Sequence, residues 1–247
     1  MVVRCVWLLI ILAALALLRP GAPAAAQELR LGGHIQVTET ILAFLVAGRI
    51  TDVKVSEGDE VKVGQVVAEL DKKLLAQEVE AAQGALDAVD ADPTPKPKKL
   101  KDADLKQARA ALEVARLRLG YATLASPLAG VVLTRAAQPG EVAAVGMPIV
   151  TVADLDTVWF EGFVPEPDLG RIRLGQKAEV ISDSFPDQKF PGTVQYISPK
   201  AEFTPKTVET YKERITLVYR TKIKLANPER RLKKGMPAEA VVYLDNR

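Results

Sequence analysis

The chain has 247 residues and a formal net charge of +2, with 48% hydrophobic but only 5% aromatic residues. This length is enough for one or two domains with their own hydrophobic cores. A charge so close to neutral excludes the strongly basic class of nucleic-acid-binding proteins, and the low aromatic content is unusual for a large enzyme pocket.

Residues 1–26 have the pattern of a signal peptide. Arg4 supplies a positive start, Val6–Leu18 is an unbroken run of 13 apolar residues, and "APAAAQ" places small residues before Gln27. The run is shorter than the ~20 residues that a membrane span needs, so we expect cleavage after Ala26 and export to the periplasm. An uncleaved inner-membrane anchor is the alternative. Cleavage would also remove Cys5, the only cysteine, and would leave a chain without disulfides.

The sequence repeats itself on either side of a long insertion. One segment, "GRITDVKVSEGDEVKVGQVVAELD", and a second, "GVVLTRAAQPGEVAAVGMPIVTVAD", carry glycine triplets with the same spacing of ten residues and then six. Alternating apolar residues between the glycines predict short strands. Each half is too small to bury a core alone, so we expect the two to pack as one flattened, lipoyl-like β-sandwich. The glycines are Gly48, Gly58 and Gly64 in the first half and Gly130, Gly140 and Gly146 in the second.

Residues 72–125, between the two halves, have the pattern of a helical hairpin. Apolar residues step by three and four along each arm, as in the seam of an antiparallel coiled coil. Pro93, Pro95 and Pro97 cannot continue a helix and mark the turn between arms of about 20 residues each. The seam residues are Leu75, Val79, Ala82, Leu86 and Val89 in the first arm and Leu105, Ala108, Leu112, Ala115 and Leu119 in the second.

Opposite charges on the two arms agree with this pairing. The range Glu78–Asp92 carries five acids and no base, whereas the range Lys96–Arg118 carries eight bases and three acids. Because an exposed ion pair contributes only ~0.2–1 kcal/mol, the apolar seam carries the prediction and the charges support it.

The stretch Glu57–Lys73, "EGDEVKVGQVVAELDKK", resembles the first half of a biotinyl or lipoyl carrier domain. In such domains the two halves meet in a tight β-turn that bears the modified lysine. Lys72 occupies the corresponding place here, but a helix is expected to begin at this position. We therefore expect no cofactor, and a carrier modified on Lys72 stands as an alternative.

The split half-motifs, the hairpin and the return segment "SPLAGVV" (Ser126–Val132) together resemble the HlyD-type membrane fusion proteins, the periplasmic adaptor subunits of bacterial export pumps. "FTPKTVETYKERITLVYRTKIKL" (Phe203–Leu225) and "LKKGMPAEAVVYL" (Leu232–Leu244) resemble the YbhG-like branch, whose members work with ABC-type exporters. The resemblance implies a non-catalytic adaptor. It would link an inner-membrane transporter, with the ABC type favoured, to periplasmic or outer-membrane components for efflux or secretion, as a ring-forming homo-oligomer.

After Asp154 the pattern changes to strand-like runs separated by proline, glycine and charge, which favours a small closed barrel without exposed sheet edges. The family has a barrel in this place. The segment "PEPDLGRIRLGQKAEV" resembles its strand, short helix and strand, with the helix at Asp168–Arg173. We also expect Leu29–Val37 to pair with Ala238–Leu244 as a remnant of the family's membrane-proximal domain. The predicted strands are 158–164, 178–181, 192–197, 216–225 and 238–244.

These elements predict a mostly β protein with one helical hairpin. Its expected parts are a signal peptide at 1–26, the first sandwich half with a leading strand at 27–71, the hairpin at 72–125, the second half at 126–154, a β-barrel at 155–230 and a C-terminal strand at 231–247.

The hairpin tip, "DADPTPKPKKLKD", bears on the choice of partner. Family members that dock onto an outer-membrane channel carry an Arg, a Leu and a Ser at four-residue spacing there, and this tip has no such trio. Contact with an outer-membrane channel therefore stays an open alternative among the partners that the resemblance implies. Two interpretations of the tip lysines stay open, a contact with an acidic partner or anionic headgroups and a solubilising role in a proline-rich turn. These residues are Lys96, Lys98, Lys99 and Lys101.

Residues that carry chemistry are scarce. His34 is the only histidine, and no G-x-x-x-x-G-K-[ST] phosphate loop occurs. Neither a metal-ligand cluster nor a catalytic triad can be assembled, so we expect no enzymatic activity and no metal. A stand-alone periplasmic binding module, with a ligand between barrel and sandwich, is a further alternative.

Overall fold

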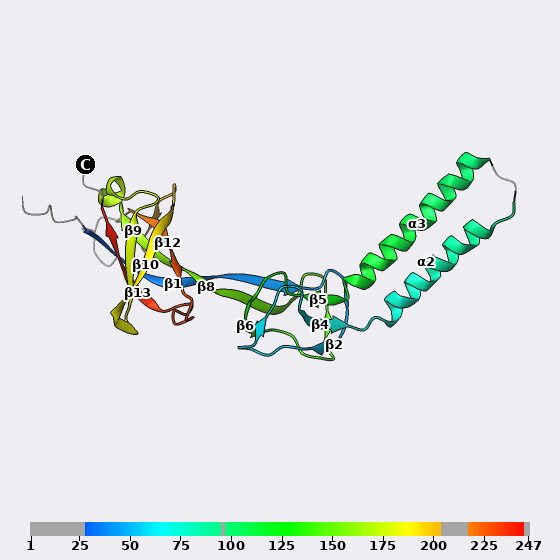
Figure 1. Ribbon diagram of the computed structural model, residues 1–247, viewed down its shortest axis with the longest axis horizontal. Helices are drawn as coiled ribbons and strands as arrows, with labels where there is room; N and C mark the ends of the chain where they lie inside the picture. Colours follow the sequence, from blue (N-terminus) through cyan, green and yellow to red (C-terminus); the bar gives the residue numbers. More distant parts are fainter. Residues whose placement is uncertain (1–27, 95–96, 204–216, 245–247) are drawn as a thin grey trace, which may run out of the picture.

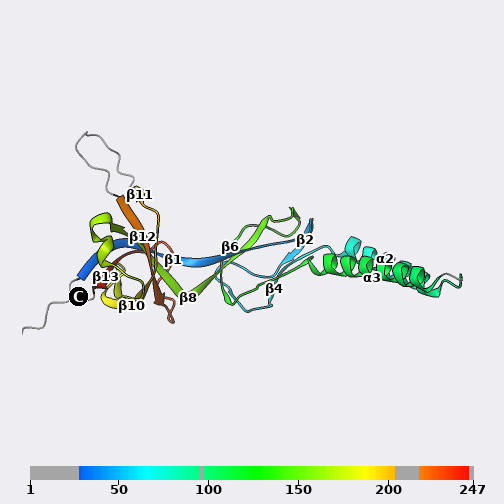
Figure 2. The ribbon, with the colours of Figure 1, turned by 90° about the horizontal axis from the view of Figure 1, so that it is seen from above.

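The computed structural model describes residues 28–94, 97–203 and 217–244, so the expected signal peptide lies outside the described residues. The protein is extended, with a β-barrel at one end, a sandwich in the middle and a helical hairpin at the other end (Figures 1 and 2). This arrangement confirms the predicted fold class.

The two repeated halves form a single sandwich. Its four-stranded layer has the order β5-β4-β2-β7, and its other layer contains β3, β6 and the adjoining parts of β1 and β8. Ile50 and Val132, one from each half, are fully or almost fully buried in the same apolar cluster. The strands are β1 (Glu28–Ala43), β2 (Gly48–Val53), β3 (Glu60–Val61), β4 (Val66–Leu70), β5 (Thr123–Ala125), β6 (Gly130–Arg135), β7 (Val142–Ala143) and β8 (Pro148–Pro165).

Quasi-symmetric backbone hydrogen bonds join the two halves. Gly58 N–H donates to the carbonyl oxygen of Val132 at 2.9 Å, and Gly140 N–H donates to the carbonyl oxygen of Ile50 at 2.8 Å. Each turn glycine therefore binds the first strand of the opposite half. Because these bonds run in both directions between the halves, the halves complete one another and share one core.

Positive φ angles explain the glycines at these turns. Gly58, Gly64, Gly140 and Gly146 have φ between 78° and 94°, a region that side chains with a Cβ rarely adopt. Gly130 has a different reason, since a Cβ there would lie 2.3 Å from the carbonyl oxygen of Ala153 on the neighbouring strand. The glycine spacing seen in the sequence thus reflects turn geometry and close strand approach.

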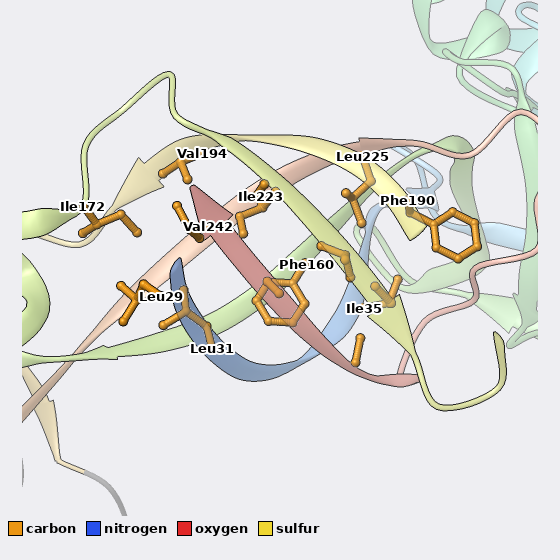
Figure 3. Close-up of a cluster of buried hydrophobic side chains, with 14 of the residues drawn as sticks. Leu29, Leu31, Ile35, Phe160, Ile172, Phe190, Val194, Ile223, Leu225 and Val242 are labelled. Carbon is orange, nitrogen blue, oxygen red and sulfur yellow. The ribbon is translucent and has the colours of Figure 1, made fainter. Parts of the chain in front are cut away.

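The barrel uses the remaining lengths of β1 and β8. Its strands follow the order β12-β10-β9-β13-β1-β8, and β12 pairs with β8 to close the ring. Phe160, Ile35 and Ile223 are completely buried at its centre (Figure 3). The predicted strands are therefore confirmed as β8, β9 (Lys177–Ser182), β10 (Phe185–Ile197), β12 (Leu217–Ala226) and β13 (Pro237–Tyr243), and the short β11 (Glu202–Phe203) pairs with β12.

Two details of the barrel differ from the expectation. The helix expected at Asp168–Arg173 is instead a 3₁₀ turn, η1 (Glu166–Arg171), which ends because Ile172 becomes extended and buries its side chain in the barrel core. Residues 231–244, the described part of the expected C-terminal region, do not stand apart from the barrel, because their strand β13 lies inside the barrel sheet between β9 and β1. The expected pairing of the two chain ends is present, since Leu29 pairs with Val242, but it belongs to the barrel and not to a separate remnant.

The hairpin consists of α2 (Lys73–Ala91) and α3 (Lys98–Gly120). It leaves the sandwich where β4 ends and returns to it at β5, so the helices replace the short turn that would otherwise join the two halves. Figure 1 shows the two helices side by side, pointing away from the sandwich and the barrel.

Candidate functional site

The apolar residues predicted for the seam are among the less exposed residues of the two helices, and Leu75 packs against the sandwich core. All ten are buried or half-buried, and Leu112 and Ala115 are the two that are buried most completely. We call this set, Leu75, Val79, Ala82, Leu86 and Val89 with Leu105, Ala108, Leu112, Ala115 and Leu119, the inner seam. Its packing holds the hairpin as one body that projects from the sandwich.

Polar contacts between the arms are few and exposed. Arg118 lies 3.8 Å from Glu78 across the hairpin, and the Nζ of Lys101 donates to the carbonyl oxygen of Asp90 at 3.4 Å. Lys101 is therefore bound within the hairpin, whereas Lys98 and Lys99 are exposed in the first turn of α3 and Lys96 lies outside the described residues. Contact between these lysines and a partner stays a prediction.

Lys72 lies immediately before α2 and is bound to its neighbours. Its Nζ lies 3.2 Å from Glu69, which Lys54 also approaches at 3.4 Å. The hydrogen bond from Lys72 is the main reason why the pKa of Glu69 is lowered. The chain continues from Lys72 into a helix, so the exposed β-turn that a carrier lysine requires is not formed at this position.

The junction between sandwich and barrel is a β-bulge. β1 and β8 pair on both sides of it, but Val37 pairs with Val158 whereas Thr38 pairs with Asp154. Leu155, Asp156 and Thr157 therefore bulge out of the ladder, and such bulges bend and twist a strand where two sheets meet. Apart from this bulge, two continuous strands join the domains without a flexible linker.

A loop after β12 fastens this bulge to the sandwich. Arg230 donates from Nε to Asp156 at 2.7 Å and forms a second ion pair with Glu60 of β3. The buried Asn227 donates its side-chain N–H to the carbonyl oxygen of Leu155 at 2.8 Å. The Arg230 guanidinium holds the pKa of Asp156 below its usual value, chiefly through the hydrogen bond. We call Glu60, Asp156 and Arg230 the junction clasp.

A cleft of about 510 Å³ lies beside the clasp, between the sandwich and the same loop. Its lining includes the apolar residues Val131, Leu133 and Leu155 and the bases Lys233 and Lys234. Lys234 forms an ion pair with Glu39 of β1. This cleft is where the alternative of a periplasmic binding module would place its ligand.

The described part of the chain was found to hold no metal-binding cluster. Among these residues no group of three or more His, Cys, Asp or Glu side chains is arranged to hold a metal ion. Within the same residues, neither helix combines the length and the apolar character that crossing a bilayer requires.

Comparison with known proteins places this architecture in a family. Residues 38–154 match the model of a CzcB-like barrel-sandwich hybrid domain, and residues 157–243 match that of a CusB-like β-barrel domain. A UPF0194 membrane protein of Yersinia pseudotuberculosis serotype IB is 30% identical over 288 residues, an alignment that covers 85% of this chain and 88% of the relative. The chain belongs to the UPF0194 family of membrane proteins.

Two further similarities agree with this assignment. A UPF0194 membrane protein of Acidithiobacillus ferridurans is 44% identical over 140 residues, which cover 57% of this chain and 41% of that protein. A crystal structure of a MacA–MexA chimera, which contains the α-hairpin domain of Pseudomonas aeruginosa MexA, has a TM-score of 0.76 at 23% identity and covers 90% of this chain and 83% of its own. This likeness shows that the chain and the MacA–MexA chimera share a fold.

The junction clasp is the structural feature of this region that the sequence did not reveal. Glu60, Asp156 and Arg230 come from three distant segments and match no motif. The only local signal is the basic loop "NPERRLKKG", which reads equally well as a solvated turn.

Proposed function

We propose that this UPF0194 protein is a periplasmic adaptor of an inner-membrane exporter of the ABC type. The observation that carries the proposal is the continuity of β1 and β8 through both β-domains, with the hairpin mounted at the far end. A movement of the barrel is passed to the sandwich through two paired strands and the junction clasp, and the sandwich carries the hairpin with it. Such a body suits mechanical coupling between a transporter and components further out.

The ABC assignment rests on sequence resemblance. The segments Phe203–Leu225 and Leu232–Leu244 resemble the YbhG-like branch, and most of the first lies outside the described residues. The competing partner is a proton-driven pump. The two partners differ in composition, since an ABC exporter brings an ATPase subunit or domain and a proton-driven pump does not.

Affinity purification from the native host tests the proposal. A tagged adaptor is cross-linked in intact cells, purified in detergent and analysed by mass spectrometry, and we expect an ABC membrane subunit and its ATPase in the eluate. Recovery of a proton-driven pump instead would refute the ABC assignment and keep the adaptor role. Failure to recover any inner-membrane transporter would refute both. A tagged Val132→Asp protein, which places a charge in the sandwich core, serves as the control for non-specific capture.

Separate measurements test the two alternative functions, a cofactor carrier and a binding module. The intact mass of the exported protein decides the carrier alternative, with Lys72→Arg as the matched control, and we expect both proteins to be unmodified. The junction cleft is the feature that favours a binding module. Competition by small amphipathic anions against a fluorescent fatty-acid probe tests it, and Lys233→Ala with Lys234→Ala should abolish any binding that occurs there.

A further inference from the structure

A second stripe of residues, apolar except for Gln107, runs along the outer face of α3 and ends at its C-cap Tyr121. Its members step by three, four, three, four, three and four residues, the same period as the inner seam. All seven are exposed, and the four large hydrophobic members have between 41% and 56% of their surface accessible. We call this set the outer seam, and it consists of Leu100, Ala103, Gln107, Ala110, Val114, Leu117 and Tyr121.

The two seams lie on opposite sides of the helix. Val114 and Leu117 each come two residues after inner-seam positions, Leu112 and Ala115, and two residues correspond to about 200° around a helix of 3.6 residues per turn. α2 therefore covers one face of α3, and none of the described residues covers the other. A helix that packs against a single neighbour has one apolar stripe, whereas two opposite stripes at heptad spacing are typical of a helix between two neighbours.

Charge distinguishes the helices that could cover this face. α3 carries seven bases and three acids, so a second α3 packed against it would bring like charges together. α2 carries four acids and a single base, Lys73. A helix with the charge of α2 is therefore favoured over one with the charge of α3.

α2 also has an exposed surface that fits a neighbouring helix. Ala81, Ala85 and Ala88 are exposed at steps of four and three residues, and the exposed Leu74 extends this stripe towards the sandwich. The alanines leave room for the larger outer-seam side chains, and Ala103 and Ala110 in the outer seam allow the helix axes to approach closely. Two copies of this chain carry identical hairpins, so the outer seam of one and the alanine stripe of the other lie at the same distance from the sandwich.

We propose that the outer seam of α3 binds the alanine stripe of α2 on a second copy of this chain. The two surfaces differ, so the contact is heterologous and leaves each copy with one free surface of each kind. Repetition of the contact places hairpins side by side and closes a ring when the rotation per copy allows it. The inference deepens the proposed adaptor function, because it assigns surfaces to the association that the family resemblance implies.

Disulfide cross-linking tests the contact directly. The full chain is expressed with its export leader in a Cys5→Ser background, so that introduced residues are the only cysteines. The bond between Lys101 and Asp90 and the ion pair between Arg118 and Glu78 set the antiparallel register of the arms, which puts Ala85 and Ala110 at about the same height. Ala110 faces away from α2 of its own chain, so a disulfide between these positions has to join two copies.

Each outcome of the oxidation has a definite meaning. We expect the Ala85→Cys, Ala110→Cys double variant to form a ladder of cross-linked species, and each single variant to stay monomeric on a non-reducing gel. A dimer formed by Ala110→Cys alone would show contact between two α3 helices and would overturn the proposal. Absence of any ladder from the double variant would overturn it as well.

A second measurement tests the outer seam by charge substitution and needs no introduced cysteines. Leu117→Glu should raise the concentration at which half of the chains associate by at least about tenfold in sedimentation analysis, because it puts a carboxylate in an apolar contact. Leu174→Glu is the matched control, since Leu174 is an exposed leucine on the barrel and the substitution should leave association unchanged. Equal association of both variants would overturn the proposal. The assays need no transporter, so their failure is distinguishable from failure of the adaptor function.

Discussion

Arg230 combines a favourable set of ion pairs with an unfavourable backbone conformation, and the two effects can be separated. Its φ is +51°, and it is the only described non-glycine residue with a positive φ. Arg230→Ala removes both ion pairs of the junction clasp and keeps the left-handed backbone. Arg230→Gly removes the same ion pairs but permits that backbone without a Cβ clash.

The structure allows the magnitudes to be worked out. The side chains of Arg230, Asp156 and Glu60 are 33%, 60% and 74% exposed, so each ion pair is in the class worth ~0.2–1 kcal/mol. Arg230→Ala should therefore lower the free energy of unfolding by about 0.5–2 kcal/mol. The left-handed conformation costs a residue with a Cβ ~1–2 kcal/mol, and glycine avoids this cost. The greater freedom of glycine in the unfolded chain offsets ~0.4–1 kcal/mol of this advantage. Arg230→Gly should then be more stable than Arg230→Ala by about 0.5–1 kcal/mol.

Urea unfolding, followed by circular dichroism at low salt and in 1 M NaCl, separates the two contributions. The free energy of unfolding of Arg230→Ala should lie closer to that of wild type in high salt, because salt screens exposed ion pairs. The difference between the alanine and glycine variants should not change with salt, since backbone strain is not electrostatic. If the glycine variant is as unstable as the alanine variant, the strain argument is wrong. If salt leaves the deficit of Arg230→Ala unchanged, the ion pairs do not stabilise the junction.

Three further predictions concern glycine, the sandwich core and pH. Gly84→Ala in the exposed middle of α2 should stabilise the protein by ~0.5–1 kcal/mol, whereas Gly58→Ala, at φ +91°, should destabilise it by ~1–2 kcal/mol. Thermal unfolding measures both variants, and shifts of the unfolding temperature in the same direction would contradict this prediction. Val132→Ala should cost about 2–3 kcal/mol in urea unfolding because Val132 is buried between the two halves, and an equal loss from the exposed control Val63→Ala would refute a shared core. The pKa of Asp156 is lower in the folded state, so its contribution is present above the unfolded pKa of ~3.9 and is lost as the pH falls through the folded value. The difference in urea midpoint between wild type and Asp156→Asn should thus be constant above about pH 5 and vanish in acid, and an increase on acidification would reverse the assigned sign.

The elements whose conformation depends on residues nearby in the sequence could be predicted from the sequence. The glycine triplets predicted the paired halves because turn geometry at Gly58 and Gly140 depends on a few neighbouring residues. The inner seam followed from the helical period alone, and the barrel strands followed from their alternation. The short helix expected at Asp168–Arg173 is present as the 3₁₀ helix η1, two residues nearer the N-terminus, because burial of Ile172 ends it earlier than the local pattern indicates.

Only the tertiary structure decided which segments distant in the sequence contact one another. One sequence stretch, β1, serves both the sandwich and the barrel, and β13 closes onto it within the barrel. The junction clasp brings together residues 60, 156 and 230, and no local periodicity encodes such a meeting. The outer seam has the same spacing as the inner one, but which of them α2 covers depends on where the sandwich sends the two arms. Periodicity determines that a face is apolar, whereas the packing of the whole chain determines what meets it.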